Sequence, residues 1–178
     1  MRVMTLMSIV FLGGSCAVHA AEPSSTNSAS TDSVEYDKAV ARIWGSINST
    51  DHVVQWCAKN AGKSKKPVQT AYREWKTRFA PLIADIDARM DRMMNSSGAY
   101  SAAELAARKA DVLKRGAERY NAGIATEPQD AVKHECELLP EYFTTRSFDL
   151  EARFASELVL IRARPLEKTP STPAPPRN

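Results

Sequence analysis

Residues 67–94 constrain the fold more than any other stretch of this 178-residue chain, because they carry a long apolar stripe. The large apolar residues of this stretch are Val68, Tyr72, Trp75, Phe79, Leu82, Ile83, Ile86, Met90 and Met93. Their steps of mostly three and four place them on one face of an α-helix. At 1.5 Å per residue the helix would be about 40 Å long, and its apolar face would need several partners.

Pro81 lies inside this stripe and removes the hydrogen bond to the carbonyl oxygen of Thr77. Because the apolar residues stay in phase on both sides of Pro81, we expect one helix over about residues 67–94 that is kinked at Pro81.

Helical spacing recurs in the segments that would supply the partners. Residues 34–48 form one such segment, and the polar residues from Asn48 to Asp51 favour a break before a short second helix. One continuous helix would also fit this region. A capping box of Ser101 and Glu104 opens a further helix. The apolar stripe expected for that helix is Ala106, Ala110, Leu113, Ala117 and Tyr120.

Two more helices follow. Val132, Cys136 and Leu139 share one helical face, and Leu150, Phe154, Leu158 and Ile161 share another. The sequence predicts an all-α, single-domain bundle of five or six helices around the long central helix. Only seven glycines are present, which argues against a β-sandwich, whose turns need many.

The two ends of the chain differ from the part between them. Residues 1–20 resemble a secretory signal peptide, with Arg2, an apolar run and small residues before Ala21. We expect residues 21–33 to form a flexible linker, residues 34–164 the helical domain and residues 165–178 a proline-rich disordered tail. The protein would then be periplasmic or secreted.

Cys16 offers an alternative to signal-peptide removal. Leu12 to Cys16 resembles a bacterial lipobox, although Gly13 stands where the pattern has an aliphatic residue. Lipidation of Cys16 would anchor the protein to the periplasmic face of a membrane, and this would be its only membrane contact.

Cys57 and Cys136 remain after cleavage of the signal peptide. In an oxidising compartment an isolated pair of cysteines most simply forms a disulfide. Neither cysteine has a second ligand at the spacing that zinc sites use, so no metal site is expected.

The sequence contains no catalytic constellation. After cleavage it retains His52 and His134, and it has no G-x-S-x-G nucleophile turn. His134, Glu135 and Cys136 are adjacent on a helix and point about 100° apart, so they cannot converge on one metal ion. We therefore expect no enzyme activity, catalytic residue, metal or cofactor.

The net charge of the chain gives no indication of a nucleic-acid partner, and we expect none. Removal of residues 1–20 takes away Arg2 and no acid, which lowers the formal net charge from +3 to +2. This value is too small to imply nucleic acid or an anionic membrane as partner. Two basic clusters could receive an acidic partner, and their candidate residues are Lys63, Lys65, Lys66, Arg115 and Arg119.

The leading hypothesis is an exported, non-catalytic protein that binds another protein in the periplasm, in an inhibitory, immunity or accessory role. The layout is similar to that of small exported helical proteins of Gram-negative bacteria, a group that includes immunity proteins against periplasm-acting toxins. This similarity carries no motif and assigns no residue. The alternative is a periplasmic carrier of a small apolar ligand, with Trp44, Trp56 or Trp75 lining its pocket.

Overall fold

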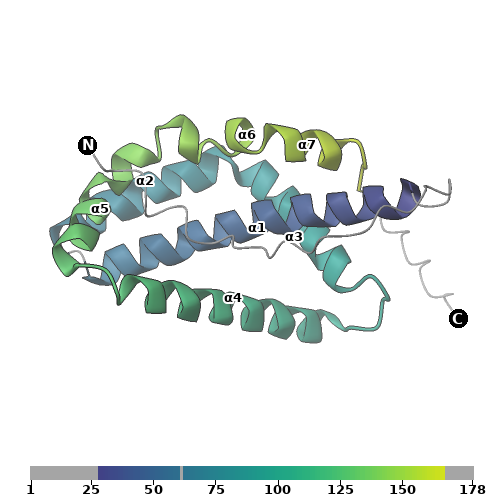
Figure 1. The fold of residues 1–178 in the computed structure, drawn as a ribbon, viewed down its shortest axis with the longest axis horizontal. Helices are drawn as coiled ribbons and strands as arrows, with labels where there is room; N and C mark the ends of the chain where they lie inside the picture. Colours follow the sequence, from purple (N-terminus) through teal and green to yellow (C-terminus); the bar gives the residue numbers. More distant parts are fainter. Residues whose placement is uncertain (1–27, 61, 167–178) are drawn as a thin grey trace, which may run out of the picture.

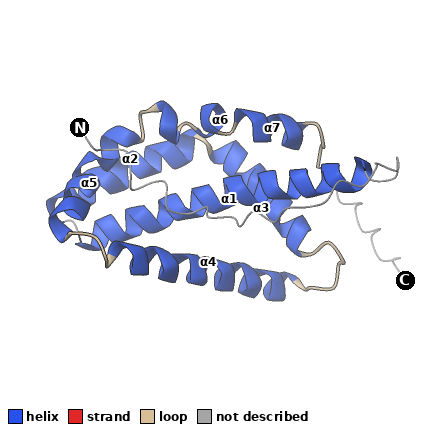
Figure 2. Cartoon of the chain, in the orientation of Figure 1, coloured by secondary structure: helices blue, strands red, loops and turns tan. Residues whose placement is uncertain are grey.

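The structure is a computed structural model that describes residues 28–60 and 62–166, in which every regular element is helical (Figures 1 and 2). The α-helices are α1 (Ser28–Asn60), α2 (Lys65–Arg78), α3 (Ala80–Met94), α4 (Ala102–Ile124), α5 (Gln129–Tyr142), α6 (Leu150–Arg153) and α7 (Ala155–Arg162). Two short 3-10 helices are also present, η1 (Gly62–Ser64) between α1 and α2, and η2 (Arg146–Phe148) between α5 and α6. The all-α class is confirmed for the described residues.

The helix that the others surround is α1, not the predicted stretch 67–94. It is 33 residues long and contacts α2, α3, α4, α5 and α7. Figure 1 shows α1 through the middle of the molecule, with α4 along one edge and α6 and α7 along the opposite edge. The core includes seven side chains of α1, which are Ala39, Val40, Ile43, Trp44, Ile47, Val54 and Cys57.

The break expected near residues 48–51 is absent, because α1 is continuous there. Asn48 Nδ2 donates to the carbonyl oxygen of Trp44 at 2.8 Å, and Thr50 Oγ1 donates to that of Ser46 at 3.0 Å. Bonding to the preceding turn lets these cap-type side chains lie inside the helix instead of ending it.

α1 also begins earlier than expected, at Ser28. No glycine or proline lies between Ser28 and Val34, so the helix can extend backward from its packed part. Residues 28–33 of the linker predicted over residues 21–33 are thus helical, and residues 21–27 lie outside the described residues. The predicted signal peptide, Cys16 and residues 167–178 also lie outside them.

The stretch 67–94 is divided into two helices at Phe79, so the prediction of one kinked helix is corrected. Phe79 has φ −102° and ψ 12°, outside the helical values, and Pro81 lies in the first turn of α3. Pro81 cannot donate to Thr77 and its ring crowds that carbonyl, so the preceding turn opens two residues before the proline.

The apolar stripe of 67–94 faces the core as predicted. Val68, Trp75, Phe79 and Ile86 are buried, and the other members of the stripe are partly buried against the same core. The prediction of one apolar face is thus confirmed across the division at Phe79.

α4 follows the predicted apolar stripe only in its C-terminal half. Its capping box is present, since Ser101 Oγ accepts from Glu104 N and the Glu104 carboxylate accepts from Ser101 N. Ala106 and Ala110, however, are exposed, and Ile124 is the one buried residue of the helix. The face toward the core carries Leu105, Lys109, Val112, Leu113, Ala117 and Tyr120, all partly buried. Leu113, Ala117 and Tyr120 of the predicted stripe thus face the core, whereas Leu105, Lys109 and Val112 take the place expected for Ala106 and Ala110.

A disulfide joins α1 to α5. The sulfur atoms of Cys57 and Cys136 are 2.06 Å apart and their Cα atoms 5.5 Å apart, so the predicted pairing is confirmed. Both residues are buried, and Val132 and Leu139 flank Cys136 on the buried face of α5.

Candidate functional site

A groove lies between the C-terminal half of α1 and α2. It has a volume of about 680 Å³. Its lining residues are Asp51, Val54, Gln55, Ala58 and Lys59 of α1, and Lys65, Gln69, Tyr72 and Arg73 of α2. We call it the basic groove, because three of its four charged residues are cations.

The groove arises from two polar stripes on neighbouring helices. Asp51, Gln55 and Lys59 are four residues apart on α1 and therefore share one face. Lys65, Gln69 and Arg73 repeat this spacing on α2. The short η1 between the helices reverses the chain, so the stripes lie opposite each other. This pair of matched stripes on either side of a turn is the sequence signal that could have identified the groove.

The one acid of the groove, Asp51, is already occupied by protein donors. Its Oδ1 accepts from Tyr72 Oη at 2.9 Å, and its Oδ2 accepts from Gln55 Nε2 at 2.7 Å. Burial raises the pKa of Tyr72, and the hydrogen bond to Asp51 raises it further, so the phenol stays protonated and remains a donor.

The three cations of the groove, Lys59, Lys65 and Arg73, remain available to a ligand. All three are exposed, and none forms an ion pair with another residue of the two described ranges. Arg73 has a 3.4 Å contact with Thr70 Oγ1, which is uncharged. An acidic ligand could therefore bind without first breaking an internal ion pair.

A smaller pocket adjoins the basic groove and shares two lining residues with it, Asp51 and Tyr72. Its volume is about 120 Å³. Its lining residues are Trp44, Ile47, Asn48, Asp51, Tyr72, Lys76, Ile83 and Asp87, from α1, α2 and α3. We call it the side pocket.

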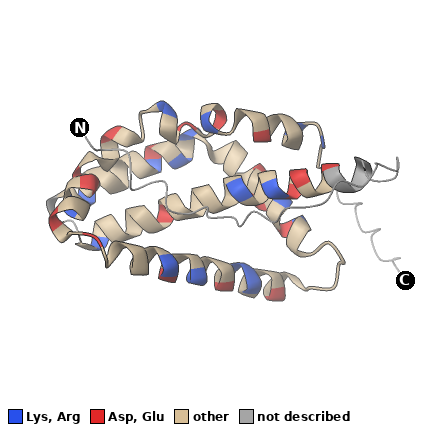
Figure 3. Cartoon of the chain, viewed as in Figure 1, with Lys and Arg blue, Asp and Glu red and all other residues tan. Residues whose placement is uncertain are grey.

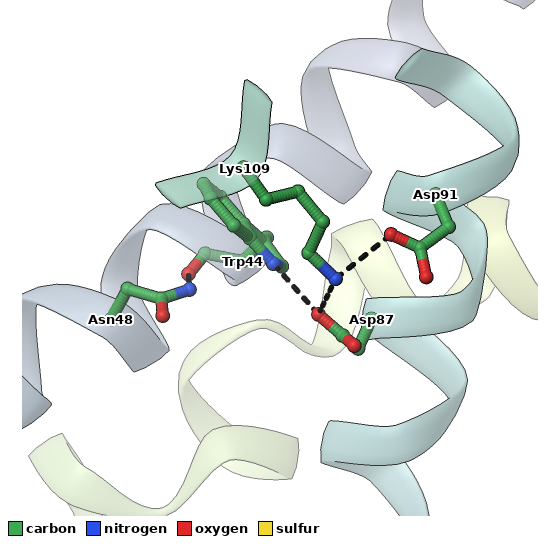
Figure 4. A network of polar contacts seen from close by, with 5 residues as sticks. All are labelled: Trp44, Asn48, Asp87, Asp91 and Lys109. Carbon is green, nitrogen blue, oxygen red and sulfur yellow. Dashed lines mark hydrogen bonds and ion pairs between the residues drawn. The ribbon is translucent and has the colours of Figure 1, made fainter. Parts of the chain in front are cut away.

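One wall of the side pocket is fixed by a polar network between three helices (Figure 4). Asp87 Oδ1 accepts from Trp44 Nε1 at 3.1 Å and from Lys109 Nζ at 2.7 Å. Lys109 Nζ also lies 2.8 Å from Asp91 Oδ1. The Lys109 side chain of α4 is 18% exposed, so the ion pairs that connect α4 to α3 are partly shielded from solvent.

Burial lowers the pKa of Lys109, but hydrogen bonds and attraction from Asp87 and Asp91 outweigh that effect and raise it overall. Lys109 therefore stays charged at neutral pH. Sequence reasoning missed this role, because the stripe expected for α4 excluded Lys109.

The predicted partner-binding residues do not form one site. Lys65 lines the basic groove, and Lys66 is exposed beside it on α2, whereas the side chain of Lys63 lies outside the described residues. Arg115 and Arg119 belong to α4, where Arg115 pairs with Asp111. Figure 3 shows basic and acidic residues alternating along α4, so this helix offers no uniform positive face. Arg73 was missing from the predicted basic clusters.

The three tryptophans also lie in different surroundings. Trp75 is fully buried and packs against Tyr72, Phe79 and Phe143, with ring centroids 5.7 to 5.8 Å away. Trp44 lines the side pocket, and Trp56 is partly buried on α1. The carrier of a small apolar ligand stays a prediction.

Neither a metal site nor a membrane span is found in the described ranges. Residues 28–60 and 62–166 contain no group of three His, Cys, Asp or Glu side chains arranged to hold a metal ion. Among the described helices, none combines the length and apolar character needed to cross a membrane. Comparison with models of protein families, with curated proteins and with solved structures found no match to this chain.

Proposed function

We propose that this chain is an exported, non-catalytic binding protein whose basic groove takes an acidic, extended segment of another protein. The observation that carries the proposal is the set of three exposed cations, Lys59, Lys65 and Arg73, that face one groove without internal ion pairs among the described residues. The role would be inhibitory, immunity-related or accessory, in the periplasm.

The shape and chemistry of the groove favour a peptide segment. Asp51 and Lys59 are eight residues apart on α1, which corresponds to about 12 Å along the helix axis. Gln55 and Gln69 add amide groups between the charges, and an extended backbone needs such partners for its own N–H and C=O groups. Val54 and Ala58 supply apolar surface between the polar residues.

Export is supported by two separate features. The N-terminal sequence matches the signal-peptide pattern, and the Cys57–Cys136 disulfide is typical of oxidising compartments. Retention of Cys16 as a lipid-anchored first residue remains the alternative within this proposal.

The proposal is tested with a fluorescein-labelled peptide of ten glutamates and the purified, disulfide-bonded protein, by fluorescence anisotropy at low salt. Reversal of the three cations, in the variant K59E/K65E/R73E, should weaken binding about tenfold or more. Binding by the unaltered protein should also weaken as salt is added, because exposed charges are screened.

The matched control is K114E/R115E/R119E on α4, which changes the net charge by the same amount at another surface. It also tests the predicted role of Arg115 and Arg119. If both triple variants weaken binding equally, only net charge matters and the groove is not the site. Circular dichroism and a thiol assay establish that each variant remains folded and oxidised.

A further inference from the structure

The two hollows carry opposite charge, although they share the Tyr72–Asp51 hydrogen bond. In the basic groove the cations outnumber the acids by two. In the side pocket, Asp51 and Asp87 face a single cation, Lys76. Lys109 and Asp91 belong to the polar network that forms one wall of the side pocket. When both are included, three acids still face two cations.

Acceptor atoms in the side pocket remain open to a donor. Oδ1 of Asp87 has two donors, but no described residue donates to its Oδ2. Asn48 uses its Nδ2 on the carbonyl of Trp44, which leaves its amide oxygen without a described donor. A cation entering the pocket would also meet the aromatic surface of Trp44, which attracts positive charge.

We propose that the side pocket holds one basic side chain, lysine or arginine, of the same segment whose acidic part occupies the basic groove. This inference rests on the proposed function. The protein would thus recognise an acidic cluster and a basic residue at a fixed distance from each other. Whether the basic residue precedes or follows the acidic cluster in the ligand sequence would determine the N-to-C direction of the bound segment.

The distance between the two positions follows from α1, which lines both hollows. Asn48 of the side pocket and Lys59 of the basic groove are eleven residues apart, or about 16 Å along the helix axis. An extended chain advances about 3.3 Å per residue, so about five residues of ligand span this distance. The volume of about 120 Å³ has room for the end of one side chain and excludes a folded element.

The test uses labelled peptides with a block of four glutamates in a glycine–serine background. One series carries a single lysine five, eight or twelve residues from the far glutamate of the block, on its N-terminal or its C-terminal side. We expect lysine five residues from the far glutamate, on one side only, to tighten binding at least fivefold over the lysine-free peptide. The other positions should change it less than twofold.

The variant D87N should remove this fivefold gain. The amide oxygen that replaces the Asp87 carboxylate would still accept from Trp44, and Asp91 would still hold Lys109, so the α4 contact is retained. The control is D37N, which removes an exposed acid of α1 outside both hollows and should leave the gain intact.

The outcomes separate this inference from the proposed function. If the glutamate block binds and K59E/K65E/R73E abolishes that binding, but no lysine position tightens it, the basic-side-chain pocket is wrong and the basic groove stands. The pocket is also wrong if D87N and D37N lower the gain equally. If the glutamate block does not bind at all, both proposals fail.

Discussion

The indole nitrogen of Trp75 donates a 2.6 Å hydrogen bond to the backbone carbonyl oxygen of Phe148, 73 residues later in the chain. Trp75 is fully buried, and Phe148 belongs to η2, just before α6. This bond connects α2 to the C-terminal part of the fold, in a cluster that also contains Phe143.

Replacement of Trp75 by phenylalanine should lower the free energy of unfolding by about 2–3 kcal/mol. The variant leaves the Phe148 carbonyl without its donor in a buried place and also opens a small void. Urea unfolding followed by circular dichroism measures the loss. Trp56→Phe, at a partly buried position, serves as the control and should cost less than about 1 kcal/mol. Equal losses would contradict a special role for the Trp75 bond.

Replacement of both disulfide cysteines by alanine should lower the free energy of unfolding by about 4 kcal/mol. The bond closes a loop between residues 79 positions apart, and the unfolded chain gains that freedom when the bond is absent. Urea unfolding with and without a thiol reductant measures the effect. Reductant should destabilise the unaltered protein and leave C57A/C136A unchanged. An unaltered protein that is insensitive to reductant would show that the bond contributes little.

Lys109→Met should loosen α4 more than the rest of the fold. The change keeps the unbranched shape of the side chain, shortened by one atom, but leaves the carboxylates of Asp87 and Asp91 without their cation, at a cost of about 1–2 kcal/mol. Hydrogen exchange should show faster exchange of the α4 amides. The control on the same helix is Lys114→Met, whose side chain is 75% exposed and whose ion pair with Glu118 is 3.7 Å long. Faster exchange in the control variant would argue against the Lys109 contact.

The ionisation of Tyr120 should lower the free energy of unfolding at alkaline pH. Burial raises the pKa of Tyr120 to about 12 in the folded protein, above the ordinary value of 10.0. Its contribution is therefore complete below about pH 10 and is lost as pH rises toward 12, because the unfolded chain ionises first. The loss should approach about 2 kcal/mol.

The check on Tyr120 is the free energy of unfolding at pH 8 and at pH 11.5. The variant Y120F should lose less stability between these values than the unaltered protein. Burial also raises the pKa of Tyr72 and Tyr142, so part of the alkaline loss should remain in the variant. Identical pH profiles would contradict the assignment to Tyr120.

Two glycines should respond to alanine in opposite directions. Gly45 lies inside α1, and a Cβ added there meets nothing within 4 Å, so Gly45→Ala should stabilise the protein by about 0.5–1 kcal/mol. Gly98, between α3 and α4, has a φ of +67°, where alanine is strained, so Gly98→Ala should destabilise it by about 1 kcal/mol. Thermal unfolding of the two variants measures both changes, and a shift in the same direction would overturn the argument.

The sequence allowed the composition of the core to be predicted better than the limits of the helices. The stripe that contains Val68, Trp75 and Ile86 is correct because burial of large apolar side chains dominates folding. The prediction of a single kinked helix is wrong because Pro81 changes the backbone conformation at Phe79. The spacing of apolar residues carries no information about that local change. The break in α1 is wrong because Asn48 and Thr50 bond to carbonyls of their own helix, a choice that residue type alone leaves open.

Buried charges were the harder part to predict. Arg89 lies among the charged residues of α3, yet it is 5% exposed and donates to Asp85, Tyr36 and the carbonyl of Arg164. Two of these partners lie in other parts of the chain, so no local pattern could have indicated them. Among the predicted partner-binding residues whose side chains the structure describes, Lys65 alone lines the basic groove, because the groove depends on how α1 and α2 face each other.

The Cys57–Cys136 bond makes one closed covalent ring of everything from the end of α1 to the middle of α5. The exposed turn around Ser96, Ser97 and Gly98 lies inside this ring. A protease that nicks the turn would therefore release no fragment, and the two pieces would migrate as a single species on a gel until a thiol reductant separates them. Outside the cell, where proteases are frequent and reductants are scarce, such a cut chain would keep its helices together.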